Sequence, residues 1–342
     1  MDAKTHGNPG PSPVEAVLQL STGVWTAQAL WAAASLGVAD QLASGPKTRD
    51  ELARAADAQP RALYRVLRAL ACLGVFAERA DGRFENTPQS EFLRSDVPGS
   101  VRDYVIFAGQ PWHLAAFADI LHSVRTGEPS GERAVGKPLW EFFATDGEQG
   151  RIFNAAMTGI IGGRAMAVRD AYDFSGVRTL VDVGGGHGLL LATVLAGNPS
   201  LHGVLFDQPH VVDGAGPTIS RLGVQDRTAI VGGDFFREVP EGDAYVMSHI
   251  IHDWDDEPSV KILRTIRRAA EPGARLLLVE AVIPAGNAFS FGKILDLEML
   301  ALPGGLERTE SEYRALLAEG GFRMTRIVPT RSSSEIVEAV AA

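Results

Sequence analysis

The sequence has little cysteine, no surplus of positive charge and no long apolar run, and each shortage excludes a class of protein. Cys72 is the single cysteine among 342 residues, so neither an intramolecular disulfide nor a cluster of thiolate metal ligands can form. It lies in an apolar stretch, and we expect its thiol to pack in the core. Acidic residues outnumber basic ones, 42 to 32, which argues against a nucleic-acid substrate.

The shortage of apolar runs bears on membranes and secretion. No segment reaches the roughly eighteen apolar residues of a membrane-spanning helix. Residues Met1–Pro13 lack the apolar core of a secretion signal, so we expect a cytoplasmic protein that needs no membrane. The length exceeds what one hydrophobic core usually supports, which predicts two domains.

The first hundred residues have a helical pattern followed by a hairpin. Apolar residues recur at helical spacing over 14–42, which predicts two helices. Thr48 and Glu51 form a capping box that begins a short helix, and Pro60 opens a longer one through Leu73. Two short apolar runs flank Asp81-Gly82, a turn typical of hairpins. The combination is a winged-helix pattern.

The sequence pattern changes twice over the rest of the chain. Residues 100–171 are helical in pattern and rich in aromatics, which is typical either of a core or of a ligand pocket. After Phe174, short apolar runs alternate with amphipathic segments, and this pattern predicts a mostly parallel sheet with helical crossovers. The predicted strands are Thr179–Val183, Gly203–Phe206, Thr228–Val231, Ala244–Ile251, Leu276–Val279, Met324–Val328 and Ile336–Val340.

We therefore predict an α/β protein with a Rossmann-like, mostly parallel seven-stranded sheet and a mainly helical, winged-helix-like N-terminal domain. The domain boundaries that we expect are 1–100 for the winged-helix-like domain, 101–175 for a helical linker and pocket region, and 176–342 for the sheet domain.

The segment Val181–Gly188 leaves a strand and enters a helix, and its glycines allow a tight turn and the close approach of a nucleoside-type ligand. A dinucleotide fingerprint starting at Gly184 would need glycine where Leu189 stands, which disfavours NAD. Asp207 ends the next strand, where a carboxylate can accept hydrogen bonds from ribose hydroxyls.

Two further groups follow at the same edge of the sheet. Asp234 either faces an adenine amino group or serves as a turn residue, and the ring of Phe235 can pack on the base. His252 follows the fourth strand, and the carboxyl ends of parallel strands face the ligand crevice. Glu280 ends the next strand, where a buried carboxylate needs a partner. We therefore expect His252 to act chemically.

From about Val14 onward the chain resembles the family of plant caffeic-acid-type and bacterial aromatic-polyketide O-methyltransferases, which includes hydroxyindole O-methyltransferase. The resemblance rests on six ordered motifs: Asp182-Val183-Gly184-Gly185-Gly186, Phe206-Asp207-Gln208-Pro209, Gly233-Asp234-Phe235, His252-Asp253-Trp254, Glu280 before Pro284, and Gly304-Gly305-Leu306-Glu307-Arg308-Thr309.

The resemblance implies a reaction and its residues. It implies S-adenosylmethionine as the cofactor, no metal, and methylation of a phenolic hydroxyl with His252 as general base between Glu280 and Glu307. It implies that the N-terminal domain forms a homodimer and contributes to the partner's pocket. The cofactor-binding residues that it implies are Gly184, Gly186, Asp207, Gln208, Asp234, Phe235 and Ser248.

Candidate substrate contacts come from the same resemblance. They are Asp253, Phe153, Asn154, Met157 and Met299. Core packing remains open for Phe153, Met157 and Met299, and loop support for Asp253. Plant members usually have lysine and tryptophan at Ser248 and His249, whereas the serine resembles bacterial antibiotic-pathway members. This favours a bicyclic or polycyclic phenol from secondary metabolism.

Two other functions stay open. One is a relative that keeps S-adenosylmethionine but runs another reaction such as hydroxylation, although retention of His252, Glu280 and Glu307 argues against it. The other is a winged-helix DNA-binding regulator that uses Arg61, Arg65 and Arg68, which the acidic composition disfavours.

Overall fold

The computed structural model describes residues 11–342, and the chain divides into two compact units, one ending at Gly109 and the other starting at Gln110. Each unit is described by itself. Among the described residues, no helix combines the length and the apolar character needed to cross a membrane.

The first unit is mainly helical with a small sheet. Its elements are α1 (Pro13–Ser21), α2 (Gly23–Ser35), α3 (Val38–Leu42), β1 (Lys47–Thr48), α4 (Arg49–Ala55), α5 (Pro60–Cys72), β2 (Phe76–Glu78), β3 (Arg83–Asn86), the 3-10 turn η1 (Ser90–Leu93) and α6 (Arg102–Ala108). The sequence predicted two helices over residues 14–42, whereas the structure has three. Gly37 adopts a left-handed conformation with φ of 62° and separates α2 from α3.

Helix α5 shows how this unit buries its apolar face. Leu63, Leu67 and Leu70 recur at helical spacing and are almost fully buried in the core of the unit. Cys72 lies off this stripe and its side chain is exposed, so the prediction of a packed core thiol is wrong. The apolar neighbours of Cys72 in the sequence project to other faces of the helix.

The hairpin of the first unit has a third strand that the sequence did not reveal. Strand β3 pairs with β2, as predicted, and also with the two-residue β1, so the sheet order is β1-β3-β2. Three predicted DNA-contacting arginines on α5 are exposed and, with Arg49, line a hollow of about 760 Å³.

The second unit begins with helices and continues as an α/β domain. The helices before the sheet are α7 (Pro111–Ala118), α8 (Ile120–Thr126), α9 (Ser130–Val135), α10 (Leu139–Thr145) and the long α11 (Gly147–Ala171). The strands are β4 (Thr179–Val183), β5 (His202–Asp207), β6 (Thr228–Gly232), β7 (Ala244–Ser248), β8 (Arg275–Glu280), β9 (Phe322–Val328) and β10 (Glu335–Ala341). The remaining elements are α12 (Leu189–Gly197), α13 (Pro209–Val212), α14 (Gly216–Arg221), η2 (Gln225–Arg227), η3 (Ile251–Asp253), α15 (Asp256–Ala269), α16 (Phe291–Ala301) and α17 (Glu310–Glu319).

The seven strands have the order β6-β5-β4-β7-β8-β10-β9. The five strands β6, β5, β4, β7 and β8 run parallel to one another, and β10 is antiparallel to both β8 and β9. The prediction of a mostly parallel seven-stranded sheet is confirmed. The chain reverses its direction of growth between β4 and β7, and in open α/β sheets ligands bind beyond the carboxyl ends of the strands at such a point.

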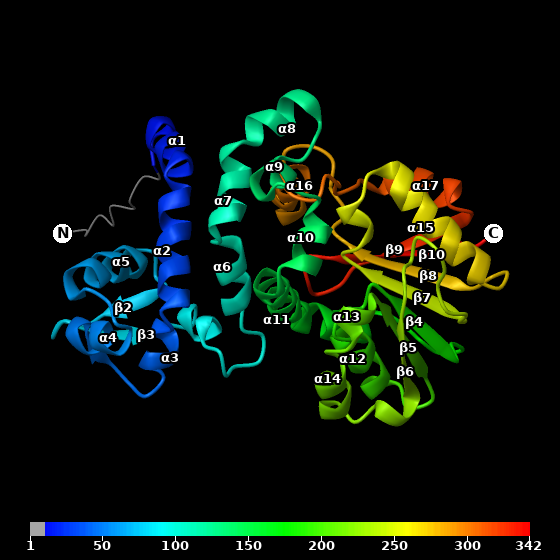
Figure 1. The fold of residues 1–342 in the computed structure, drawn as a ribbon, viewed down its shortest axis with the longest axis horizontal. Helices are drawn as coiled ribbons and strands as arrows, with labels where there is room; N and C mark the ends of the chain where they lie inside the picture. The colour runs from blue at the N-terminus through cyan, green and yellow to red at the C-terminus, as the bar shows by residue number, and fades with distance from the viewer. Residues whose placement is uncertain (1–10) are drawn as a thin grey trace, which may run out of the picture. The chain divides into compact units, whose positions relative to one another are not determined.

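Helices cover both faces of this sheet (Figure 1). On one face, Val181, Tyr245 and Leu278 pack against α15 and α17. On the other face, Leu180 and Val246 pack against α11, α12 and α14. Because neighbouring strand residues alternate between these two cores, the central strands β4, β7 and β8 are buried on both sides.

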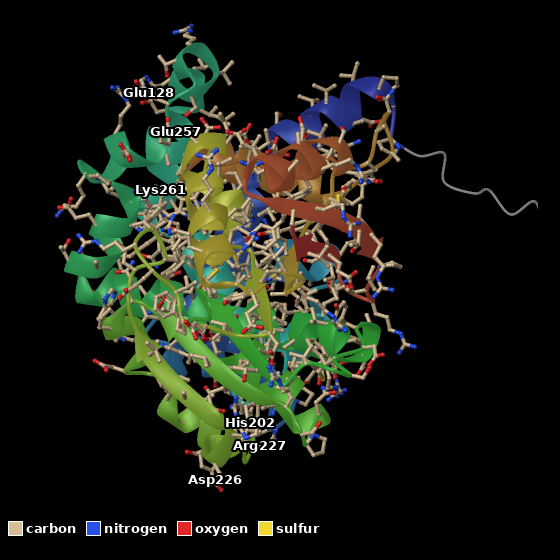
Figure 2. All side chains as sticks on the ribbon, turned by 90° about the vertical axis from the view of Figure 1, so that its right-hand side faces the viewer. Glu128, His202, Asp226, Arg227, Glu257 and Lys261 are labelled. Atoms are coloured by element: carbon tan, nitrogen blue, oxygen red, sulfur yellow. The ribbon has the colours of Figure 1, made fainter. Side chains whose placement is uncertain are left out.

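The sheet also has two distinct ends. His202 opens β5 and Arg227 immediately precedes β6, so both lie at the amino ends of the strands, and Figure 2 labels them in the lower part of the view. Glu257 and Lys261 lie in the first turns of α15, which follows the carboxyl end of β7, and Figure 2 labels them in the upper part of the view. Arg227 closes the first end by donating hydrogen bonds to the carbonyls of Leu195, Asn198 and Leu201. The opposite end holds the candidate site.

Candidate active site

His252 lies on a short 3-10 turn rather than at the end of a strand. Strand β7 stops at Ser248, three residues earlier than predicted, because His249 has a positive φ of 54° that turns the chain out of the sheet. The next two N–H groups, of Ile250 and Ile251, donate to Glu280 Oε1 at 3.2 and 3.0 Å instead of pairing with a strand. Glu280 therefore fixes the turn that carries His252.

The structure brings the three predicted catalytic residues together. His252 is 5% exposed, and its Nδ1 lies 2.7 Å from Glu307 Oε1 and 3.9 Å from Glu280 Oε2. The other ring nitrogen, Nε2, is 3.4 Å from Asp253 Oδ1. A hydrogen bond from Nδ1 to Glu307 makes Nε2 the nitrogen that is open to accept a proton.

Burial sets the protonation of the carboxyl groups around this ring. It raises the pKa of Glu280 to about 7, that of Glu307 to about 8 and that of Asp253 to about 7. The three carboxyls therefore titrate near neutral pH, well above their usual range. At neutral pH part of the charge of these carboxyls is therefore neutralised by bound protons.

Arg308 is a positioning residue that sequence reasoning did not single out. Its side chain is 1% exposed and donates to the carbonyls of Ile251 and Trp254 and to the carboxylate of Asp256. The guanidinium thus ties the His252 turn to the segment that carries Glu307. Gly305 adds a close backbone approach, because a Cβ there would overlap the carbonyl of His252. The sequence signal for Arg308 was its place next to Glu307 in the last of the six motifs.

His249 is a second residue that the sequence left without a role. Its ring lies 4.5 Å from the ring of His252, nearly perpendicular to it, and Nε2 is 2.8 Å from Ser334 Oγ. Burial lowers the pKa of His249 well below its usual range, so the ring is neutral. It supports the catalytic imidazole without adding a charge.

The glycine-rich turn after β4 fits a nucleoside ligand. Gly184 and Gly186 have φ of 74° and 57°, where glycine is favoured. A Cβ at Gly186 would meet no atom within 4 Å, so its backbone faces open space. Asp207 Oδ2 accepts the N–H of Gly186 at 2.8 Å and Oδ1 that of Gln208 at 2.6 Å. These residues form a cradle with free lone pairs beside an open backbone.

Asp234, Phe235 and Ser248 are the remaining candidates at this end. Asp234 is exposed, and its Oδ1 accepts the N–H of Phe236, which is the turn role that the sequence left open. The ring of Phe235 packs against Phe236 at 5.0 Å. Ser248 Oγ is buried without a hydrogen-bond partner among the described residues.

The candidate substrate residues lie on α11, α16 and the His252 turn. Phe153 stacks on Phe143 at 4.5 Å and meets the edge of Trp140, which stacks on Trp254. The aromatic stripe is therefore one packed cluster that reaches the catalytic turn. Asn154 and Met157 are partly buried on α11, and Met299 is buried on α16.

Two protein-family models match this chain. Residues 117–323 match the model of the O-methyltransferase domain, and residues 18–96 match that of the O-methyltransferase dimerisation domain. The chain belongs to this O-methyltransferase family. The resemblance inferred from the six motifs is confirmed, and the enzyme is a methyltransferase with a family dimerisation domain.

Curated relatives match nearly the whole chain. The phenazine O-methyltransferase PhzM of Lysobacter antibioticus is 46% identical over 96% of this chain and 97% of its own length. The mitomycin biosynthesis 6-O-methyltransferase of Streptomyces lavendulae is 40% identical over 95% of each chain. The crystal structure of LaPhzM superposes with a TM-score of 0.92 at 45% identity, covering 97% of this chain and 100% of that one.

The relatives also identify the cofactor and show which reactions occur among similar proteins. The O-methyltransferase NcsB1, 32% identical with a TM-score of 0.82 and coverage of 98% and 100%, was solved with S-adenosylmethionine and a naphthoic acid. The cofactor of this methyltransferase is S-adenosylmethionine. Matching relatives also include an N,N-dimethyltransferase of Streptomyces davaonensis, 36% identical, and the aclacinomycin 10-hydroxylase RdmB of Streptomyces purpurascens, 33% identical.

Proposed function

We propose that this enzyme methylates a phenolic hydroxyl of a small aromatic secondary metabolite, with His252 as the general base. The observation that carries the proposal is the buried imidazole whose Nδ1 is held by Glu307 at 2.7 Å. That contact orients the ring and leaves Nε2, which has only the carboxyl of Asp253 at 3.4 Å, to take the substrate proton. A base for an O–H group needs these two properties.

The arrangement lowers the cost of removing the proton. Transfer from a phenol to an imidazole is uphill in water by about 5 kcal/mol. Glu307 and Glu280 lie at 2.7 and 3.9 Å from Nδ1 and favour the imidazolium that forms on Nε2 protonation. S-adenosylmethionine, when bound, supplies an activated methyl group and a positive charge. The protein's task is to orient the acceptor oxygen and to hold its proton.

A hydroxyl acceptor fits the site better than an amine. A phenol gains nucleophilic strength when a base takes its proton, whereas an aromatic amine already has a free lone pair. Two buried carboxyls and the partly buried Asp253 around one imidazole are a costly arrangement that an amine acceptor would not need. We therefore favour O-methylation over the N-methylation of some relatives.

The substrate class follows from relatives and from the aromatic cluster. The matching proteins act on phenazine and mitomycin scaffolds or bind a naphthoic acid. We infer a flat bicyclic or polycyclic acceptor that is placed by Asp253, Asn154, Met157 and Met299 next to the cluster around Phe153. The cofactor lies at the glycine turn, contacted by Gly184, Gly186, Asp207, Gln208, Asp234, Phe235 and Ser248.

The wider organisation is part of the same proposal. We infer a homodimer formed through the winged-helix-like N-terminal domain, residues 1–100, because the dimerisation model matches 18–96. Residues 101–175 supply the substrate helix α11, and residues 176–342 bind the cofactor. The acidic composition and the absence of a membrane-spanning helix in the described part of the chain are compatible with a cytoplasmic enzyme.

The test is methyl transfer itself. The purified protein and its His252→Ala variant are incubated with labelled S-adenosylmethionine and a panel of hydroxylated naphthoates, anthraquinones, phenazines and indoles. The unaltered protein should yield an O-methyl product, and the variant should turn over more slowly by on the order of 10²–10⁴ with similar cofactor affinity. Equal turnover would remove His252 as the base. A product that is hydroxylated, without release of S-adenosylhomocysteine, would place the enzyme with the hydroxylase.

A further inference from the structure

The first unit contains a hollow that the proposed reaction does not use. It has a volume of about 760 Å³ and lies over the start of α4 and residues 60–68 of α5 (Figure 1). The described residues that line it include no aspartate or glutamate, and its charged members are all arginines: Arg49, Arg61, Arg65 and Arg68. The chain as a whole is acidic, so this positive surface is a local exception.

Contacts with one aromatic ring fix where two of these arginines lie. The guanidinium carbons of Arg49 and Arg68 are 5.5 and 5.8 Å from the ring centre of Tyr64. The Tyr64 ring packs edge-on against the buried Phe84, with ring centres 6.0 Å apart. An arginine from α4 and one from α5 are therefore held against a ring that is anchored in the core of this unit.

The positive charges of α5 repel one another without compensation. Arg61, Arg65 and Arg68 are spaced by four and three residues, so they are neighbours on one side of the helix. They are exposed, and none has an ion pair or hydrogen bond to a described residue. Helix α5 has no acidic residue that could supply one. Arg49 has only the exposed carboxylate of Asp50, at 3.7 Å.

The amino terminus of α5 opens onto the same hollow. Gln59, Pro60, Arg61 and Ala62 all line it. Gln59 Oε1 accepts the N–H of Ala62 at 2.6 Å, whereas the N–H of Arg61 belongs to the first turn and has no acceptor within the helix. The positive end of the helix dipole therefore adds to the field of the four guanidinium groups.

We propose that this hollow binds a small ligand that carries two or more linked phosphate groups. Its volume is typical of a small-molecule site. A planar guanidinium matches the oxygens of a phosphate and can donate two parallel hydrogen bonds to it. Adjacent arginines need adjacent negative charges, and a chain of phosphates supplies more of them in a small volume than a single carboxylate does. The site is separate from methyl transfer, so either proposal can fail without the other.

A DNA duplex is the other phosphate-rich partner, because a helix-turn-helix can place its second helix in the major groove. The hairpin that follows α5 disfavours it. Arg79 donates to Glu85, and Arg83 lies 3.4 Å from Glu51, so these arginines are already paired with acids. The hairpin turn carries the exposed Asp81. A duplex would extend beyond the hollow over such acidic groups, whereas a small ligand would not.

The test measures binding to the whole chain by calorimetry, with inorganic tripolyphosphate as the probe. At about 0.15 M salt, the unaltered protein should bind this probe at least about tenfold more tightly than orthophosphate or citrate. Arg61→Gln together with Arg65→Gln should weaken its binding by at least about tenfold. The unfolding temperature of this variant without ligand should not fall, because the substitutions remove a pair of like charges.

A matched variant separates a built site from general attraction between charges. Arg264→Gln together with Arg314→Gln removes the same formal charge from two exposed ion pairs of the second unit. Binding of tripolyphosphate to this control should be unchanged. Equal weakening in both double variants would overturn the proposal, as would equal affinity of the unaltered protein for tripolyphosphate, orthophosphate and citrate.

Two further probes identify the source of the phosphates. Adenosine triphosphate that binds as tightly as tripolyphosphate would show that the phosphate chain alone is recognised, and tighter binding would indicate a nucleotide. Both results keep the proposal, provided that Arg61→Gln with Arg65→Gln weakens both probes. A short DNA duplex that binds more tightly than tripolyphosphate, and that the same variant releases, would make the hollow part of a nucleic-acid surface and overturn it.

Discussion

Asp182, at the carboxyl end of β4, shows at the residue scale how a buried carboxyl links the nucleotide end to pH. Its side chain is 1% exposed, and one carboxyl oxygen has no hydrogen bond among the described residues. Burial, and then the charge of Asp207, raise its pKa to about 7. Because the folded protein holds this proton more tightly than the unfolded chain, the associated stability is present below about pH 4 and is lost as the pH rises through 7.

Asp182→Asn should therefore gain stability over the unaltered protein as the pH rises. The difference in the free energy of unfolding between the two proteins should shift in favour of the variant by about 3 kcal/mol from pH 5 to pH 8.5. Urea unfolding at both values measures it. Asp226→Asn, at an exposed position (Figure 2), is the control and should show no such trend. A constant difference for Asp182→Asn would contradict this account.

The sequence did not predict the residues whose role depends on contacts with distant parts of the chain. His252, Glu280 and Glu307 could be predicted because their motifs stand at strand ends or in family patterns, and the structure brings all three together. His249 could not, since a positive φ leaves no local pattern in the sequence. The prediction that Cys72 packs in the core was wrong because residues that are neighbours in sequence do not share a helix face.

At the element scale, the turn η3 depends on Arg308. The guanidinium binds two carbonyls of the turn and Asp256 at the start of α15, so it fixes where His252 stands. Arg308→Lys should lower the free energy of unfolding by roughly 2–4 kcal/mol and reduce kcat more than it changes KM, because buried acceptors lose their donors. Thermal unfolding and initial rates measure both effects.

The control for Arg308 is a pair on the neighbouring helix. Arg314 and Glu310 form an exposed ion pair on α17, and Arg314→Lys should change stability by less than about 0.5 kcal/mol. If Arg308→Lys were equally mild, the guanidinium would not position the turn.

The elements themselves were mostly predictable, for a physical reason. The central strands β4, β7 and β8 are buried on both faces and give continuous apolar runs, so their positions could be read within a few residues. Strand β1 has two residues and pairs only at the edge of β3, which is too short to leave a pattern. The end of β7 was missed because Ile250 and Ile251 continue the apolar run after the chain has turned at His249.

At the scale of the whole molecule, the proposed homodimer needs an apolar surface to bury. The first unit exposes Val17 by 65%, Leu18 by 57% and Trp25 by 70% on α1 and α2. A surface of this kind is typical of an interface rather than of a monomer in water. The family dimerisation model begins at residue 18, within α1.

Leu18→Glu together with Trp25→Glu should therefore convert a dimer into a monomer, with a loss of activity if the partner completes the pocket. Sedimentation velocity gives the oligomeric state. Leu73→Glu, at an exposed apolar side chain beyond α5, is the matched control and should leave the dimer intact. A monomeric unaltered protein, or a dimer that survives the double substitution, would contradict the proposal.

The central claim is that His252 removes the proton of an acceptor hydroxyl. The most direct measurement compares kcat/KM for the unaltered enzyme and His252→Ala across hydroxynaphthoates whose hydroxyl groups are made progressively more acidic by ring substituents. An acidic hydroxyl needs less help, so the defect of the variant should shrink steadily toward unity as the acceptor pKa falls. A defect of the same size for every acceptor would show that His252 does not act as the base.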